Sequence, residues 1–280
     1  MISRILSALL RAYLVAVVVA LPALFLPDIA PDTAQIVLIV ALLAALLTFM
    51  EYFGRYPSIV EFRFAPPFNR LRFAAIALTV VSLSLIMRGK TDPVALTALL
   101  TQLGEGVGRA LDFPYSPVRL AVLMLPADAG AQQVADMRLT AGVCYGVSMA
   151  MIVFFIILVR SFNWPVRRGT FNVWVNLPLF DPTSGGDVVE RLRREAGVNV
   201  LLGFSLPFIV PVMVKMLSPG TNPGPAIEAH TLIWMMTAWA LLPANVLMRG
   251  IALYRVAALI TAKRRRVYGP DTGDEALGKA

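Results

Sequence analysis

The feature that most constrains this chain is a set of six long apolar segments with very few charges inside them. A bilayer has a hydrocarbon core about 30 Å thick, which a helix of about 20 apolar residues can cross. The segments that meet this requirement are residues 5–26, 34–53, 70–88, 139–159, 196–217 and 230–248. Hydrophobic residues make up 58% of the chain and charged residues 15%, whereas soluble domains have about 45–50% and about 25%. The sequence therefore predicts an all-α, polytopic transmembrane helical bundle.

The predicted architecture is a single membrane domain, residues 1–262, followed by a cytoplasmic tail, residues 263–280, that is first basic and then disordered. The first apolar segment could instead be a cleaved signal peptide. It is longer than the usual signal core of about 7–15 residues, and residues 27–31 make a poor small-residue cleavage site. We therefore interpret it as an uncleaved helix.

Basic residues are distributed unequally between the two sides of the predicted membrane domain. The N-terminus, the two loops on its side and the C-terminal tail hold 19 of the 25 Lys and Arg residues, and the opposite side holds six. Because loops rich in Lys and Arg stay in the cytoplasm, both termini are predicted to be cytoplasmic, with six spans. Four spans with re-entrant segments are the alternative. The strong preference for Arg over Lys is typical of GC-rich bacterial genomes, so the predicted location is a bacterial inner membrane.

The largest predicted extracytoplasmic piece is residues 88–138. Over residues 93–111 an apolar side chain recurs every three or four positions, which predicts an amphipathic helix that lies in the interface or caps the bundle. The apolar positions are Leu96, Leu99, Leu103, Val107 and Leu111. Residues 118–125 are apolar but too short to span, so they are predicted to be re-entrant or packed on the bundle. The whole piece is interpreted as a space-filling lid, with a substrate vestibule as the alternative.

On the predicted cytoplasmic side, residues 51–73 interleave aromatic and charged side chains. Aromatic rings favour the headgroup level of a bilayer, and arginines there bind lipid phosphate. We interpret the segment as a structured interfacial loop, with a docking surface for a partner or an anionic headgroup as the alternative. Its candidate contact residues are Arg55, Arg63, Arg70 and Arg72.

The second predicted cytoplasmic loop, residues 160–195, has two parts. Apolar and polar residues alternate over 170–179, which predicts an extended or hairpin segment. Asp187 and Glu190 then have the spacing of a capping box, so a helix is predicted to start there. Further candidate contacts with headgroups or a partner are Arg191, Arg193 and Arg194.

A basic cluster follows the last predicted span. It consists of Lys263, Arg264, Arg265 and Arg266. Such clusters anchor topology and attract anionic lipid. Only about fourteen residues follow it, too few for a folded nucleic-acid-binding domain, so no nucleic-acid partner is predicted.

The scarcity of reactive side chains limits the chemistry. Cys144 is the only cysteine and His230 the only histidine, which excludes an intramolecular disulfide framework and a Cys/His zinc cluster. No predicted span centre holds an ionisable residue, which argues against a carboxylate proton relay. The polar side chains expected to line a cavity or to join packed helices are Ser148, Asn199, Ser205, Thr237 and Asn245. No cofactor or metal is predicted.

An enzyme would need acid–base or nucleophilic groups near one another, and no known catalytic motif is present. The densest carboxylate group outside the tail is Asp181, Asp187, Glu190 and Glu195. These carboxylates could hold Mg²⁺ at the interface. They alternate with arginines, however, and this pattern favours a salt-bridged helix face.

Three hypotheses about function follow. The first is a non-enzymatic accessory or assembly protein that binds other membrane components. The second is a transporter of a small or lipid-like substrate, because Pro207, Pro211 and Pro243 interrupt the last two spans and free carbonyls there. The third is an interfacial lipid-headgroup enzyme. The expected partners are a bilayer with anionic headgroups and either another membrane protein or a second copy of the chain.

Overall fold

The computed structural model describes residues 2–27, 29–165, 172–181, 185–217 and 228–268. Their helices are α1 (Ile2–Phe25), α2 (Pro31–Phe53), α3 (Phe68–Arg88), α4 (Ala95–Leu111), α5 (Pro117–Leu123), α6 (Ala131–Ser161), α7 (Val173–Asn176), α8 (Val188–Leu217) and α9 (Ala229–Tyr268). The described residues contain no strand. The predicted disorder of residues 271–280 lies outside them.

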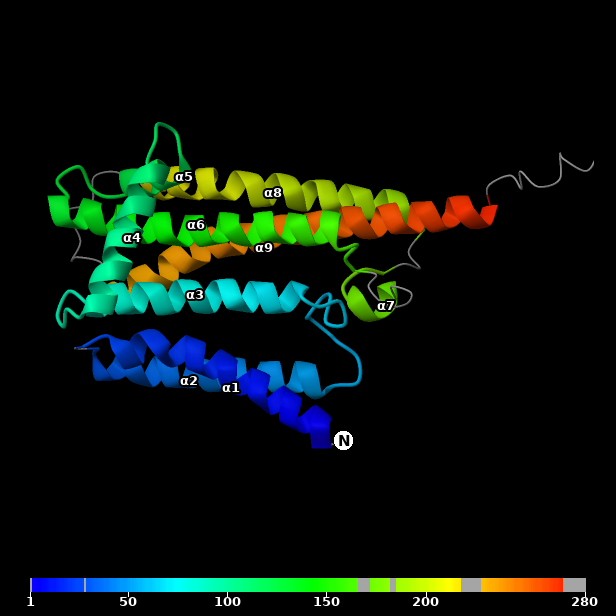
Figure 1. Cartoon of the computed structure of the whole chain (residues 1–280), viewed down its shortest axis with the longest axis horizontal. Coiled ribbons are helices and arrows are strands. Elements are labelled where there is room, and N and C mark those ends of the chain that lie inside the picture. The colour runs from blue at the N-terminus through cyan, green and yellow to red at the C-terminus, as the bar shows by residue number, and fades with distance from the viewer. Residues whose placement is uncertain (1, 28, 166–171, 182–184, 218–227, 269–280) are drawn as a thin grey trace, which may run out of the picture.

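Six of the helices, α1, α2, α3, α6, α8 and α9, are long and apolar enough to cross a membrane. They run side by side along the long axis of the molecule, while α4 lies across one end (Figure 1). The predicted all-α polytopic bundle is therefore confirmed. We call the end that holds the start of α1 and the end of α9 the terminal end, and the opposite one the distal end.

The helices extend beyond the apolar segments that predicted them. The largest difference is α9, which has 40 residues, whereas the apolar segment covers 230–248. Hydropathy marks only the stretch that suits hydrocarbon, and the residues after it, rich in Ala, Leu, Arg and Lys, are good helix formers. The basic cluster 263–266 therefore lies on the last turns of a helix.

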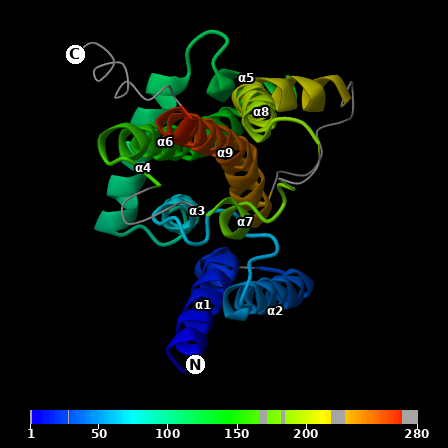
Figure 2. The same ribbon diagram turned by 90° about the vertical axis from the view of Figure 1, so that its right-hand side faces the viewer.

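The buried side chains form two main clusters between α3, α6, α8 and α9. The cluster nearer the terminal end includes Phe68, Phe155 and Met248. The cluster nearer the distal end includes Leu83 and Ile233, together with residues of α5. The pair α1–α2 lies at one edge of these helices (Figure 2), where Val18 and Leu21 of α1 are buried against Val80 of α3. Among the described helices, α2 packs against α1 alone.

Glycines allow two of the helix crossings to be very close. A Cβ atom added to Gly142 of α6 would lie 2.4 Å from the Cα atom of Gly108 in α4. A Cβ atom added to Gly203 of α8 would lie 2.5 Å from the backbone nitrogen of Leu247 in α9. Because helices in membranes associate by van der Waals packing rather than by hydrophobic burial, such small residues stabilise their crossings.

The predicted amphipathic helix is confirmed as α4, but it docks through a face other than its leucine stripe. Gly104 and Gly108 are buried against α6, whereas Leu96, Leu99 and Leu103 are 55%, 52% and 57% exposed. Close backbone approach needs the small residues, so the leucines are left to face outward.

The short apolar stretch after α4 forms α5, a helix of seven residues. The Ser116 hydroxyl caps it by accepting the Arg119 N–H at 3.0 Å. Val118 and Ala121 have no exposed surface, so the stretch is packed on the bundle, one of the two alternatives for residues 118–125.

The predicted extended segment at 170–179 is wrong for the part that the structure describes. Residues 173–176 form the helical turn α7, and residues 170 and 171 lie outside the described part. This turn is held by another loop, because the carbonyl of Asn176 accepts the Phe62 N–H at 2.7 Å. Tertiary contacts thus override the period-two pattern. The predicted helix start after Asp187 is confirmed, since its carboxylate accepts the Val189 N–H at 3.2 Å.

Candidate functional site

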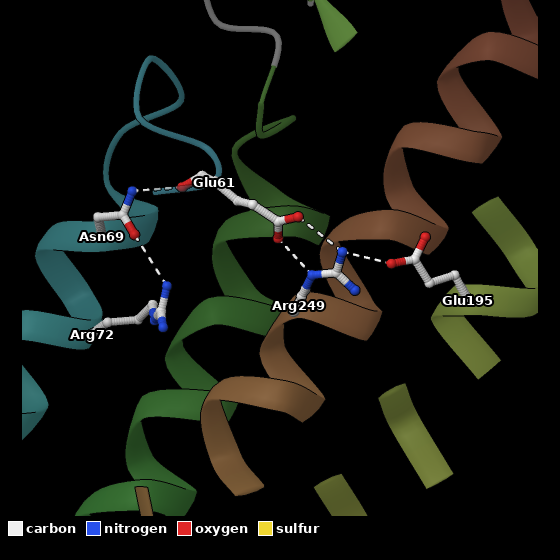
Figure 3. A network of polar contacts seen from close by, with 5 residues as sticks. All are labelled: Glu61, Asn69, Arg72, Glu195 and Arg249. Atoms are coloured by element: carbon white, nitrogen blue, oxygen red, sulfur yellow. Dashed lines mark hydrogen bonds and ion pairs between the residues drawn. The ribbon is translucent and has the colours of Figure 1, made fainter. Parts of the chain in front are cut away.

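A network of polar side chains joins four segments near the terminal end (Figure 3). At its centre, the Arg249 guanidinium of α9 donates to both carboxylate oxygens of Glu61, at 2.5 and 2.8 Å. The same guanidinium pairs with Glu195 of α8 at 2.6 Å. The Glu61 and Arg249 side chains are only 8% and 22% exposed. A fork-shaped guanidinium held this way is a strong, directional contact, so Arg249 ties α8 and α9 to the loop between α2 and α3.

A second arginine extends the network to α3. Arg72 donates from Nε to the side-chain oxygen of Asn245 at 2.8 Å and from Nη1 to that of Asn69 at 3.3 Å. The Asn69 amide in turn donates to the backbone carbonyl of Glu61 at 2.8 Å. Two predicted site residues, Arg72 and Asn245, are thus brought together as structural partners.

Aromatic side chains close the terminal end beneath the loops. Phe62, Phe68, Phe155 and Trp164 pack together with ring centroids 4.6–5.9 Å apart. The Trp164 indole N–H donates to the carbonyl of Ala65 at 3.1 Å. These contacts support the interpretation of residues 51–73 as a structured loop, because ring packing at such distances adds stability beyond area burial.

A groove of about 620 Å³ opens at the same end, between α1, the end of α2, the following loop and the start of α3. Arg11, Arg63 and Arg70 line it, together with apolar residues that include Leu10 and Phe73. Its volume falls within the range of about 300–1,000 Å³ that is usual for ligand pockets.

Two charged side chains beside this groove are already held by the chain. The Arg63 guanidinium donates to the carbonyls of Glu51, Tyr52 and Gly54 at 2.6, 2.7 and 3.0 Å. The Glu51 carboxylate accepts the backbone N–H groups of three residues of the loop, 58–60, and the Ser58 hydroxyl. Both side chains therefore have a structural role in shaping the loop.

The other arginines predicted on the terminal side are spread over its surface. Arg55 is exposed and lies 5.8 Å from the Tyr56 ring centroid, and Arg191 lies 4.9 Å from the Phe180 ring centroid. Arg193 and Arg194 are exposed on α8. Lys263, Arg264, Arg265 and Arg266 are exposed at the end of α9.

One ion pair links that basic cluster to the start of α8. Arg264 Nη1 lies 2.7 Å from Asp187 Oδ1. This hydrogen bond, followed by the one from the Val189 N–H, lowers the pKa of the Asp187 carboxyl. Asp187 and Glu195 are thus both paired, but with arginines of α9 rather than with the neighbouring arginines that the sequence pattern favoured.

The polar residues predicted inside the spans do not gather in one cavity. Ser148 lines a small void of about 50 Å³ between α6, α8 and α9, and none of the other four does. Its hydroxyl donates to the Tyr145 carbonyl at 2.8 Å. Asn199 and Ser205 are half-buried on α8, and Thr237 is buried on α9.

A tryptophan satisfies one of the carbonyls that the prolines leave without a helical donor. Pro211 lacks the N–H that would bond the carbonyl of Pro207. The Trp239 indole N–H of α9 donates to that carbonyl at 3.2 Å. The backbone break in α8 is thus used to join α8 to α9.

Sequence reasoning missed the ionic residues at both ends of the bundle. Arg249 directly follows the predicted span 230–248 and Glu61 lies within the predicted loop 51–73, and no local pattern pairs the two. At the distal end, Asp112 pairs with Arg119 at 2.8 Å and with Arg138 at 2.6 Å. The available signal was a charge directly beside a predicted span end, as at Arg138, Glu195 and Arg249, because a charge next to the hydrocarbon needs a partner. Within the part of the chain that the structure describes, no group of three His, Cys, Asp or Glu residues could hold a metal ion.

A comparison with protein-family models finds no match, and searches of curated proteins and of solved structures find none either. What can be said of function therefore depends on the geometry above.

Proposed function

We propose that this chain is a non-enzymatic accessory protein of a membrane, which works by binding another membrane protein through the outer face of the α1–α2 hairpin. The observation that carries the proposal is the packing of α2, which contacts α1 alone among the described helices. The face of α2 toward α1 is a narrow stripe that includes Val37 and Ala41.

The rest of α2 presents large apolar side chains outward. Leu42, Leu43 and Leu46 are 61%, 54% and 56% exposed. Helix association inside a bilayer is driven by close packing rather than by transfer out of water. A partner helix on this face of α2 would add van der Waals contacts that α1, its single neighbour among the described helices, does not provide.

The contacts between α8 and α9 favour this role over transport. The Gly203–Leu247 approach and the Trp239–Pro207 hydrogen bond hold the two helices together where the prolines were expected to open a cavity. The ion pairs of Asp187 and Glu195 favour it over catalysis by carboxylates, because paired carboxylates are less available as metal ligands. Transporter and headgroup enzyme remain the alternative hypotheses.

The proposed location is a bacterial inner membrane with the terminal end in the cytoplasm. The asymmetry of basic residues supports it, and the buried Cys144 leaves labelling of added cysteines unobscured. In intact spheroplasts, a membrane-impermeant maleimide should label Gly130→Cys and should not label Val267→Cys until the cells are opened. The reverse pattern would overturn the orientation.

Site-specific photocrosslinking in native membranes tests the proposed partner surface. A photoreactive residue at Leu42, Leu43 or Leu46 should give one discrete product, recovered in a fixed ratio to the chain after mild detergent extraction. The matched controls are Leu201 of α8 and Phe154 of α6, which are similarly exposed, at 66% and 51%. Equal products from the controls, or no protein product from any α2 position, would contradict the proposal.

Co-expressing two copies with tags of different size distinguishes the identity of the partner. A product that contains both tags would identify a second copy of the chain and overturn binding of a different protein. A product with one tag and a second polypeptide would support it.

A further inference from the structure

We infer that the groove between α1, α2 and α3 binds one phospholipid that carries a net negative charge, with its phosphate among arginines at the terminal end and an acyl chain along the apolar wall. This inference is independent of the proposed protein partner.

The positive charge around the groove exceeds the negative charge. Arg11, Arg63 and Arg70 line it. Arg70 is exposed, and among the described residues it forms no ion pair or hydrogen bond. The nearby carboxylate of Glu51, which accepts three backbone N–H groups and a hydroxyl, supplies one negative charge against these three guanidinium groups. The groove therefore carries a net positive charge, which an anion would complement.

The pKa of the Arg63 guanidinium reflects its burial and the excess of positive charge around the groove. Burial is the largest cause that lowers the pKa of the Arg63 guanidinium, and the charges of Arg11 and Arg4 lower it further, while Glu51 opposes them. Like charges that lower one another's pKa are relieved by a bound anion.

The arginines at the mouth are held in place before any ligand binds. Arg63 is fixed by three backbone carbonyls. Arg11 donates to the carbonyl of Ser7 at 2.8 Å and to its hydroxyl, and lies 4.7 Å from the Tyr52 ring centroid. A guanidinium has five N–H donors, so Arg11 keeps donors for a phosphate oxygen. Preorganised donors lower the entropic cost of binding.

The rest of the groove suits an alkyl chain. Along α1 it continues past Arg11 to Leu14 and Val15, and on α3 it reaches Phe73. These residues lie farther from the terminal end than the arginines, as an acyl chain lies deeper in a bilayer than its headgroup. A free phosphate would leave this apolar wall unused, and this is why the geometry favours a lipid.

Native mass spectrometry of the purified full-length chain tests the inference. Dioleoylphosphatidylglycerol and dioleoylphosphatidylcholine are titrated as probes against the wild type and the variant Arg11→Gln/Arg70→Gln. The wild type should retain one phosphatidylglycerol in preference to phosphatidylcholine. The variant should bind it about tenfold more weakly, because two charge-assisted contacts are lost.

The matched control is Arg193→Gln/Arg265→Gln, which removes two exposed arginines outside the groove. It should bind phosphatidylglycerol like the wild type. Equal loss in both double variants, or no preference between the two lipids in the wild type, would overturn the inference.

A second pair of variants tests the acyl-chain wall. Leu14 lines the groove and Leu9 does not, and the two are 40% and 49% exposed. Leu14→Trp should fill the groove and reduce phosphatidylglycerol retention, whereas Leu9→Trp should leave it unchanged. Retention unaffected by Leu14→Trp, or displacement of the lipid by millimolar inorganic phosphate alone, would show a simple anion site and contradict the lipid assignment.

Discussion

Arg249 shows what a single charged residue does in this bundle. It lies on α9, the longest of the described helices, and pairs with two carboxylates that come from a loop and from α8. Removing one partner of a buried ion pair leaves the other charge uncompensated, whereas replacing both partners leaves no buried charge. Arg72 differs in that the neutral amides of Asn245 and Asn69 hold it.

Arg249→Met should therefore lower the free energy of unfolding by about 3 kcal/mol, because Glu61 is left buried and unpaired. The double variant Glu61→Gln/Arg249→Met should recover at least half of that loss. Reversible unfolding in mixed micelles, followed by circular dichroism, measures both. A double variant less stable than Arg249→Met would mean that the pair is not the source of the loss.

The exposed ion pair Asp187–Arg264 should behave differently, as a local titration effect. Its hydrogen bond lowers the pKa of the Asp187 carboxyl, so the pairing persists above the ordinary carboxyl pKa and is lost as pH falls through the lowered one. Arg264→Gln should raise the pKa of Asp187 toward its ordinary value. A ¹³C carboxyl titration by NMR detects this shift, and an unchanged midpoint would contradict the pairing.

At the scale of elements, the crossing of α4 and α6 depends on glycines, which have no side chain to keep the two backbones apart. Each helix carries glycines four residues apart, Gly104 and Gly108 on one and Gly142 and Gly146 on the other. Such pairs let helix backbones approach closely. The glycine spacing can be read in the sequence, although the leucine stripe indicates another face of α4 as the apolar one.

Gly142→Ala should destabilise the bundle by about 1–3 kcal/mol, the usual cost of overpacking, since the added Cβ would lie 2.4 Å from Gly108 Cα. The control is Gly106→Ala, where an added Cβ meets nothing within 4 Å. It should be neutral or stabilising by up to about 1 kcal/mol through helix propensity. Thermal unfolding of both variants gives the comparison, and equal loss in both would show that the crossing is not close.

At the scale of the whole molecule, the described chain has a densely packed body and a peripheral hairpin. The body consists of α3, α6, α8 and α9 with their shared buried clusters, and α2 contacts it only through α1 among the helices. Stability is therefore expected to reside mainly in the body.

Two adjacent phenylalanines on α6 test where that core lies. Phe155 has no exposed surface, whereas Phe154 is 51% exposed. Phe155→Ala should cost about 3–5 kcal/mol, as large-to-small core substitutions do, and Phe154→Ala less than about 1 kcal/mol. Chemical unfolding in micelles separates them. Equal costs would place the core elsewhere.

The sequence by itself determined the fold class, the number of long apolar helices and the amphipathic helix, because these depend on local hydropathy and periodicity. The helix start at Asp187 was also predictable, since capping involves neighbours in the chain. Only the tertiary structure decided which charges pair, because Glu61 and Arg249 are 188 residues apart. It also decided which face of α4 is buried and that residues 173–176 turn into a helix. Those outcomes depend on close approach between distant segments. A local pattern, such as paired glycines or a charge beside a span end, marks a candidate contact but does not say which segment meets it.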